Sequence, residues 1–194
     1  MFDSYSEESH HGSVAFLGGS VSLEARPDSL ALERRRRSSD FMRRVTLAAP
    51  AASVMTDFTL ESPVTVAADR FIDDALQDMI AAGVRALLVM RGEIVVGLIT
   101  SYDIQGERPL QFLDASGFSR HGDIEVGHIM TPWDEVPTID LPWIRSASVS
   151  DVVERFRHKR NSHFVVVEYA DQGGAYIRGM LSRTQIERQL ERSI

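Results

Sequence analysis

A hydroxyl and a carboxylate stand three residues apart in the segment Gly97–Asp103, at the end of an apolar run that predicts a buried strand. A turn from a strand into a helix presents unpaired backbone N–H groups, which suit a phosphate. Thr100 can donate to a phosphate oxygen, and Asp103, which only accepts hydrogen bonds, can hold the two hydroxyls of a ribose. The same residues are typical of a helix N-cap, so the pattern alone leaves both interpretations open.

The chain repeats this pattern together with its surroundings. Gly97-Leu98-Ile99-Thr100 recurs as Gly179-Met180-Leu181-Ser182, and Val54-Met55-Thr56 recurs as Ile129-Met130-Thr131. The spacing between the two copies widens along the chain at positions where loops tolerate insertion. Two copies of one unit therefore organise the chain from about residue 54 onward.

Each copy predicts the same succession of strand, helix, strand, strand and helix. Gly and Pro residues mark the ends of these elements, and a helix from Ser101 is expected to end near Gly106 and Pro109. The fold class that follows is α/β (α+β), with two units of βαββα topology. The predicted strands are 63–66, 86–90 and 93–99 in the first unit and 136–139, 164–168 and 176–181 in the second.

The composition of the chain shifts near residue 50. Residues 1–50 carry scattered serines, Gly18-Gly19 and four consecutive arginines at 34–37, and we expect a mostly disordered arm. The arginine run is either a solvated stretch or a binding segment for an acidic partner or nucleic acid. The predicted division is an arm at 1–50, a first unit at 51–112, a linker at 113–125 and a second unit at 126–194.

Charge and composition exclude several classes of function. The net charge is −7, and it arises in residues 45–194 because residues 1–44 hold equal numbers of acids and arginines. Because phosphate binding depends on Lys and Arg, the net negative charge of residues 45–194 argues against nucleic acid as the main partner. The chain has no cysteine, no apolar run of membrane-spanning length and an acidic, polar start, so we expect a cytoplasmic protein.

Motifs of the common catalytic sites are missing from the sequence. It has no nucleophile elbow, no P-loop and no His-Glu-x-x-His, and its histidines lack metal-ligand spacing. We therefore expect neither an enzyme nor a metal site.

The motifs, taken in order, resemble a tandem pair of CBS (cystathionine-β-synthase-type) domains. The resemblance rests on Val54-Met55-Thr56, on Gly-Val-Arg-Ala-Leu-Leu-Val at 83–89 and on the segment 97–103, each at its place in the repeat. It implies pseudo-twofold symmetry between the units and dimerisation of the pairs. It also implies regulatory binding of an adenine nucleotide (AMP, ADP or ATP) or S-adenosylmethionine between the units, with no other cofactor required.

The resemblance implies one main site whose contacts come from both units. Asp103 would hold the ribose hydroxyls, and Thr100 would face the phosphate. The remaining contacts would be Arg85, Ser162 and His163 near the phosphates, with Val165 and Ile139 against the adenine.

The corresponding site of the other repeat departs from the family pattern. Gln185 stands where the ribose-binding carboxylate belongs, after Ser182. A neutral amide loses the charge-assisted bonds of a carboxylate, so we expect this second site, with Val64 and Thr65 on its other side, to be weaker.

Three hypotheses about function follow. The first is a ligand sensor, expected to be a homodimer in keeping with the family, that signals to an unknown effector protein through a change of geometry. The second is a platform that dimerises and binds no nucleotide. A third hypothesis treats the arginine run as a nucleic-acid tether.

Overall fold

Two four-stranded sheets with matching strand orders lie at the centre of the protein. The structure is a computed structural model that describes residues 44–117, 120–158, 161–169 and 175–191. The strand order is β2-β3-β4-β5 in one sheet and β6-β7-β8-β1 in the other. The strands are β1 (Thr56–Asp57), β2 (Thr65–Ala67), β3 (Ala86–Arg91), β4 (Ile94–Thr100), β5 (Thr131–Pro132), β6 (Thr138–Asp140), β7 (His163–Tyr169) and β8 (Ala175–Ser182). In each sheet the outermost strand, β2 or β6, runs parallel to its neighbour, and the remaining pairs are antiparallel. The predicted mixed fold and the repeat of one unit are confirmed.

The first unit contains the predicted succession of elements. β2 (Thr65–Ala67) leads to α2 (Ile72–Ala82), then to the hairpin of β3 (Ala86–Arg91) and β4 (Ile94–Thr100), and finally to α3 (Ser101–Gln105). Helix α2 buries Ile72, Ala75 and Met79, which share one face, and ends at Gly83 with a φ of 69°.

The second unit repeats the succession with one additional helix. β6 (Thr138–Asp140) is followed by α6 (Leu141–Ser146), which the sequence analysis missed, and by α7 (Val149–His158). A capping box opens α7, because Ser148 N donates to Asp151 Oδ2 at 2.8 Å and Asp151 N donates to Ser148 Oγ at 3.3 Å. The unit ends with β7 (His163–Tyr169), β8 (Ala175–Ser182) and α8 (Arg183–Glu191).

The connection between the units contains a helix that the sequence analysis did not predict. α4 (Arg108–Ser116) begins where a helix was expected to end. Pro109 lies in its first turn, where a missing N–H breaks no intrahelical bond, so this proline starts a helix instead of stopping one. The 3₁₀ turn η2 (His121–Asp123) and α5 (Val126–Ile129) complete the connection.

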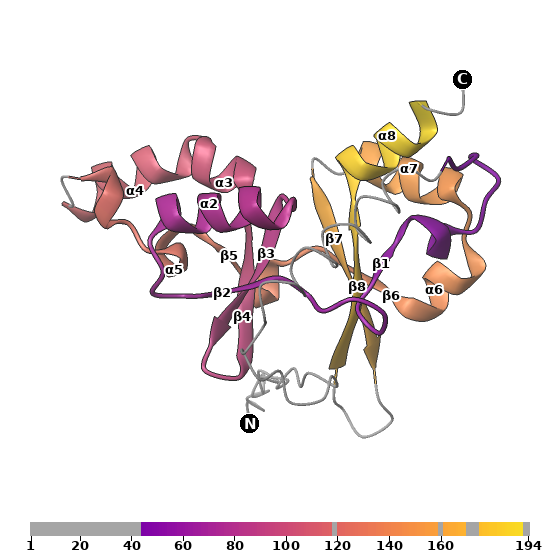
Figure 1. Ribbon diagram of the computed structural model, residues 1–194, viewed down its shortest axis with the longest axis horizontal. Coiled ribbons are helices and arrows are strands. Elements are labelled where there is room, and N and C mark those ends of the chain that lie inside the picture. The colour runs from indigo at the N-terminus through magenta and orange to yellow at the C-terminus, as the bar shows by residue number, and fades with distance from the viewer. Residues whose placement is uncertain (1–43, 118–119, 159–160, 170–174, 192–194) are drawn as a thin grey trace, which may run out of the picture.

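Each repeat gives its leading strand to the sheet of the other repeat. The segment with η1 (Ala51–Val54) and β1 (Thr56–Asp57) packs on the second unit, where β1 pairs with β8. Reciprocally, β5 (Thr131–Pro132), which is followed by η3 (Trp133–Glu135), pairs with β4 of the first unit. Figure 1 shows the indigo start of the described chain lying beside β8. The sequence repeats and the sheets therefore do not coincide.

Two glycines of the repeated motif permit this exchange. A Cβ on Gly97 would overlap the carbonyl oxygen of Thr131 in β5, and a Cβ on Gly179 would overlap that of Thr56 in β1. The glycines are thus required by the close approach of another backbone.

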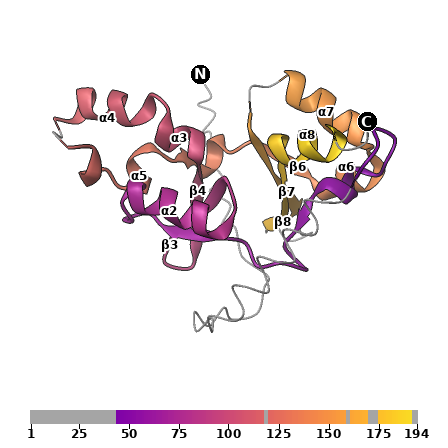
Figure 2. The same cartoon turned by 45° about the horizontal axis from the view of Figure 1, so that its top comes forward.

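Three apolar clusters hold the elements together. Two of them lie between a sheet and its own helices, and the third joins the sheets through Leu88, Leu98, Val165 and Val167. Both faces of β7 are therefore covered, which explains the apolar run Phe164–Val167 at its centre. Figure 2 shows the helices α3 and α4 at one end of the molecule and α6, α7 and α8 at the other.

The predicted N-terminal arm and the possibility of a membrane-spanning helix remain to be compared with the structure. Residues 1–43, with the arginine run of the predicted arm, lie outside the described residues. Among the helices that are described, none has the length and apolar character needed to cross a membrane.

Candidate functional site

Two clefts lie where the units meet, and each is lined by residues from both. Cleft A has a volume of about 480 Å³ and cleft B a volume of about 340 Å³. Four predicted site residues, Thr100, Asp103, Ser162 and His163, line cleft A together. The other residues that line it are Leu98, Tyr102, Arg108, Thr131, Pro137, Asn161, Arg183 and Thr184.

In cleft A the hydroxyl and the carboxylate of the repeated motif bind each other. Thr100 N and Thr100 Oγ1 donate to Asp103 Oδ2 at 2.8 Å and 2.7 Å, and Asp103 N donates to Thr100 Oγ1 at 3.3 Å. These bonds form a capping box at the start of α3. The N-cap interpretation of the motif is therefore correct for this state of the cleft, and the same two side chains also line it.

A guanidinium that the sequence analysis missed covers the other oxygen of Asp103. Arg108 Nη1 lies 3.2 Å from Asp103 Oδ1 and also donates to the carbonyl oxygen of Ile129 at 2.8 Å and to Thr131 Oγ1 at 3.1 Å. Arg108 belongs to the first turn of α4, and that helix was not predicted. No sequence signal pointed to this contact, because it depends on how α4 follows α3.

His163 lies between the clefts and lines both of them. Its side chain is buried, and its Nδ1 is 2.9 Å from Ser162 Oγ. Burial, and then the positive charge of nearby Arg85, lower the pKa of His163 to about 4. At neutral pH the imidazole is uncharged, so His163 offers a ligand a hydrogen bond and not the positive charge that its position suggested.

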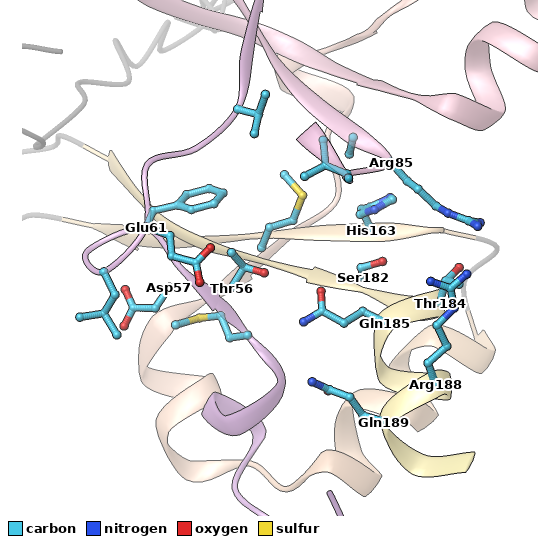
Figure 3. A pocket seen from close by; sticks show the side chains of 18 of the residues that line it. Thr56, Asp57, Glu61, Arg85, His163, Ser182, Thr184, Gln185, Arg188 and Gln189 are labelled. Carbon is cyan, nitrogen blue, oxygen red and sulfur yellow. The ribbon is translucent and has the colours of Figure 1, made fainter. Parts of the chain in front are cut away.

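Cleft B holds most of the residues predicted for the second site. Ser182, Gln185 and Val64 line it, and Figure 3 shows Gln185 on α8 directed into it. Arg85 and Arg188 lie toward one end of the cleft and Asp57 and Glu61 toward the other (Figure 3). Its apolar lining consists of Ala52, Met55, Phe58, Leu60, Val64, Val84, Ala86 and Met180.

Arg85, which was predicted to share a site with Asp103, lines cleft B instead. The repeat explains this placement: Ala86 pairs with Thr100, as His163 pairs with Ser182, so Arg85 and Ser162 occupy equivalent positions before β3 and β7. Equivalent residues in a pseudo-twofold pair face opposite clefts. The prediction that both serve one site mixed the two copies.

Three further predicted residues line neither cleft. Val165 is fully buried between the sheets, and Ile139 is 2% exposed in the cluster under α7. Thr65 is exposed on β2, outside both clefts. Alternation along a strand accounts for the positions of Val165 and Ile139, because side chains that pack in a core cannot also face a surface cleft.

Arg188 was also missed in the sequence, although a signal was present. It follows Gln185 by three residues on α8, and residues at this spacing share a helix face. A predicted ligand contact on a helix therefore directs attention to cations one turn further on.

The matching sheets, the exchanged strands and the two ligand-sized clefts define a tandem-repeat α/β protein with sites between its repeats. The sequence pattern of the CBS domain matches residues 51–108 and 126–192, so this chain belongs to the CBS-domain family. Among proteins with curated descriptions, none matches it.

Several solved structures are similar to this chain, and the first of those named here, with a TM-score above 0.5, shares its fold. An uncharacterized conserved protein from Pyrococcus horikoshii is 21% identical, covering 77% of this chain and 95% of that one, with a TM-score of 0.52. The CBS-pair protein CBSX2 of Arabidopsis thaliana, in complex with AMP, is 21% identical over 72% of this chain and 94% of its own (TM-score 0.48). The CBS domain of a bacterial CNNM/CorC family Mg²⁺ transporter, in complex with ATP, is 14% identical over 83% and 96% (TM-score 0.48).

Proposed function

We propose that this protein is a regulatory module that binds an adenine nucleotide in the clefts between its two units. The observation that supports the proposal is the composition of each cleft, in which side chains from both units converge. A ligand held there contacts both units at once. The volumes of clefts A and B lie within the range of small-molecule sites, roughly 300–1,000 Å³.

Cleft B offers a nucleotide three kinds of contact. Arg85 and Arg188 supply positive charge for phosphates at one end. Gln185 and Ser182 supply hydrogen-bonding groups for a ribose. Apolar side chains, among them Met55, supply the surface against which a purine packs.

Regulation follows from a ligand that bridges two units. A nucleotide can shift the angle between the units only by its difference in affinity for the two arrangements. An effector protein, or the partner in a homodimer, would detect that shift. The role that we propose is regulatory. Within the described residues, no group of three or more His, Asp or Glu side chains could hold a metal ion.

Calorimetry tests this proposal directly. Wild-type protein is titrated with AMP, ADP, ATP and S-adenosylmethionine, and the titrations are repeated with Asp103→Ala for cleft A and Arg85→Ala for cleft B. We expect wild type to bind at least one nucleotide and each variant to lose one component of that binding. Absence of binding by all four ligands at millimolar concentration would overturn the proposal.

A second function is favoured by one observation in cleft A. Five of its polar side chains already have partners, because Asp103 binds Thr100 and Arg108, and Ser162 contacts His163. A cleft satisfied in this way suits a platform that dimerises and binds no nucleotide. A stable dimer in light scattering, with a melting temperature that millimolar nucleotide leaves unchanged, would support this function.

A further inference from the structure

The carboxylate of Asp103 has little capacity left for a ligand. A carboxylate offers roughly four acceptor positions, two on each oxygen. Thr100 N and Thr100 Oγ1 occupy Oδ2, and Arg108 Nη1 lies against Oδ1. The side chain of Asp103 is only 15% exposed. The two hydroxyls of a ribose must therefore compete with Arg108 for this oxygen.

Arg108 is held in place but remains accessible from the cleft. Nη1 of Arg108 donates to the carbonyl oxygen of Ile129, the last residue of α5, and to Oγ1 of Thr131, the first residue of β5. The Arg108 side chain is 43% exposed and lines cleft A. A ligand that enters the cleft meets this guanidinium beside the carboxylate.

We propose that Arg108 makes cleft A selective for phosphorylated nucleosides. A phosphate gives the guanidinium a new anionic partner, and the carboxylate of Asp103 is then free to hold the ribose. This inference rests on the proposed function and assigns to cleft A a ligand class, nucleotides as opposed to nucleosides.

The chemistry of the competing ligands sets the direction of selectivity. Adenosine has the ribose diol but no anion, so it must separate Arg108 from Asp103 without supplying a replacement. S-adenosylmethionine carries a sulfonium cation next to its ribose, which repels the guanidinium. ADP supplies two phosphates, and charge-assisted bonds between arginine and phosphate are stronger than neutral ones.

The test compares ADP with adenosine in proteins with and without the guanidinium. Calorimetry is carried out on wild type and on Arg108→Gln, in the Arg85→Glu background, which disfavours phosphate in cleft B. In Arg108→Gln we expect ADP to bind about tenfold more weakly and adenosine about tenfold more tightly, since each charge-assisted bond accounts for about that factor. Arg91→Gln, a change on the exposed end of β3, is the matched control and should shift neither affinity.

Shifts of opposite sign separate this role from a purely structural one. If Arg108→Gln weakens both ligands equally, or changes neither, the inference is overturned. Arg108→Lys keeps the positive charge and should keep the preference for ADP, and thermal melting of each variant verifies that it folds. Failure of wild type to bind any nucleotide would instead overturn the proposed function, so the two failures are distinguishable.

Discussion

Clefts A and B occupy equivalent places in the two halves of the pair and differ in how they hold charge. Cleft A has the carboxylate Asp103, but a guanidinium already covers it. Cleft B has the amide Gln185 at the equivalent position, together with Arg85 and Arg188. The charge of a residue in a binding motif therefore does not by itself determine the charge that a ligand meets. A partner such as Arg108 can neutralise that residue within the protein.

The clefts also share components that make them comparable. His163 and Thr184 line both clefts, so these two residues form part of the boundary between them. Each contains a residue of an exchanged strand, Thr131 in cleft A and Thr56 in cleft B. Substitutions at equivalent positions can therefore perturb one cleft and leave the other as an internal reference.

The largest expected effect comes from the glycines that admit the exchanged strands. In Gly97→Ala the added methyl overlaps the Thr131 carbonyl oxygen and crowds Met130, and in Gly179→Ala it overlaps that of Thr56 and crowds Met55. We expect each change to lower the free energy of unfolding by about 3 kcal/mol, the upper range for overpacking. Urea unfolding measures it.

Gly122→Ala provides the control for these two substitutions. Its added methyl would have Asp73 Oδ2, at 3.9 Å, as its neighbour, and its backbone is unstrained. Stability unchanged in Gly97→Ala and Gly179→Ala would contradict the reciprocal exchange of strands.

A second effect concerns the wall that both clefts share. The pKa of His163 is lowered from 6.5 to about 4 in the folded protein, so between these values the unfolded chain binds more protons. The stabilisation is complete above pH 6.5 and falls as the pH falls toward 4. Between pH 7.5 and pH 5 this group should lower the free energy of unfolding by about 2 kcal/mol.

Denaturant unfolding of His163→Gln at both pH values tests this effect. The variant should lack the part of the pH dependence that His163 contributes, whereas His158→Gln, on the exposed surface of α7, should retain it. The same pH dependence in wild type and His163→Gln would contradict the buried, uncharged state of this imidazole.

A third prediction separates the clefts through Arg85. Because this guanidinium lines cleft B and not cleft A, Arg85→Gln should weaken ADP at one site of two. We expect a loss of about tenfold, equivalent to about 1.4 kcal/mol, from one charge-assisted contact. Calorimetry with Arg91→Gln as the control measures it. A loss confined to the component that depends on Asp103 would place Arg85 in cleft A.

The smallest effect is expected from giving cleft B the carboxylate of cleft A. Gln185→Asp supplies a ribose-binding anion, and the position that corresponds to Arg108 in the repeat is Leu190, which cannot cover it. Arg188 on the same helix face limits the gain, so adenosine should bind only about threefold more tightly. Gln185→Ala is the control: it has no carboxylate and should not show the tighter adenosine binding expected of Gln185→Asp. Weaker adenosine binding in Gln185→Asp would show that a carboxylate is unsuited to this cleft.

Local pattern and repetition made most of the fold predictable. The apolar runs and Gly83, Gly92 and Gly106 mark the elements of the first unit, and the second copy confirms each of them. The exchange of β1 and β5 was not predictable in this way. Each of these strands has only two residues, which is too short for any periodicity, and their partners lie far away in the sequence.

The candidate site was partly predictable for a related reason. Thr100 and Asp103 were assigned from a motif, Ser162 and His163 were implied by the family resemblance, and the four line one cleft. Arg108 could not be found, because a proline such as Pro109 either ends a helix or lies in the first turn of one, and the sequence does not say which. In the structure Pro109 lies in the first turn of α4. The contact of Arg108 with Asp103 follows from that turn.

The exchange of leading strands also makes the halves of the chain dependent on each other. A polypeptide cut between α4 and η2 would yield two fragments. The N-terminal fragment would carry β1, which belongs in the sheet of the second unit, and the C-terminal fragment would carry β5, which belongs in the sheet of the first unit. Neither fragment can complete its own sheet, and each has the piece that the other requires. Each fragment would therefore need the other to fold completely. Either fragment alone would expose an unpaired sheet edge, which promotes aggregation.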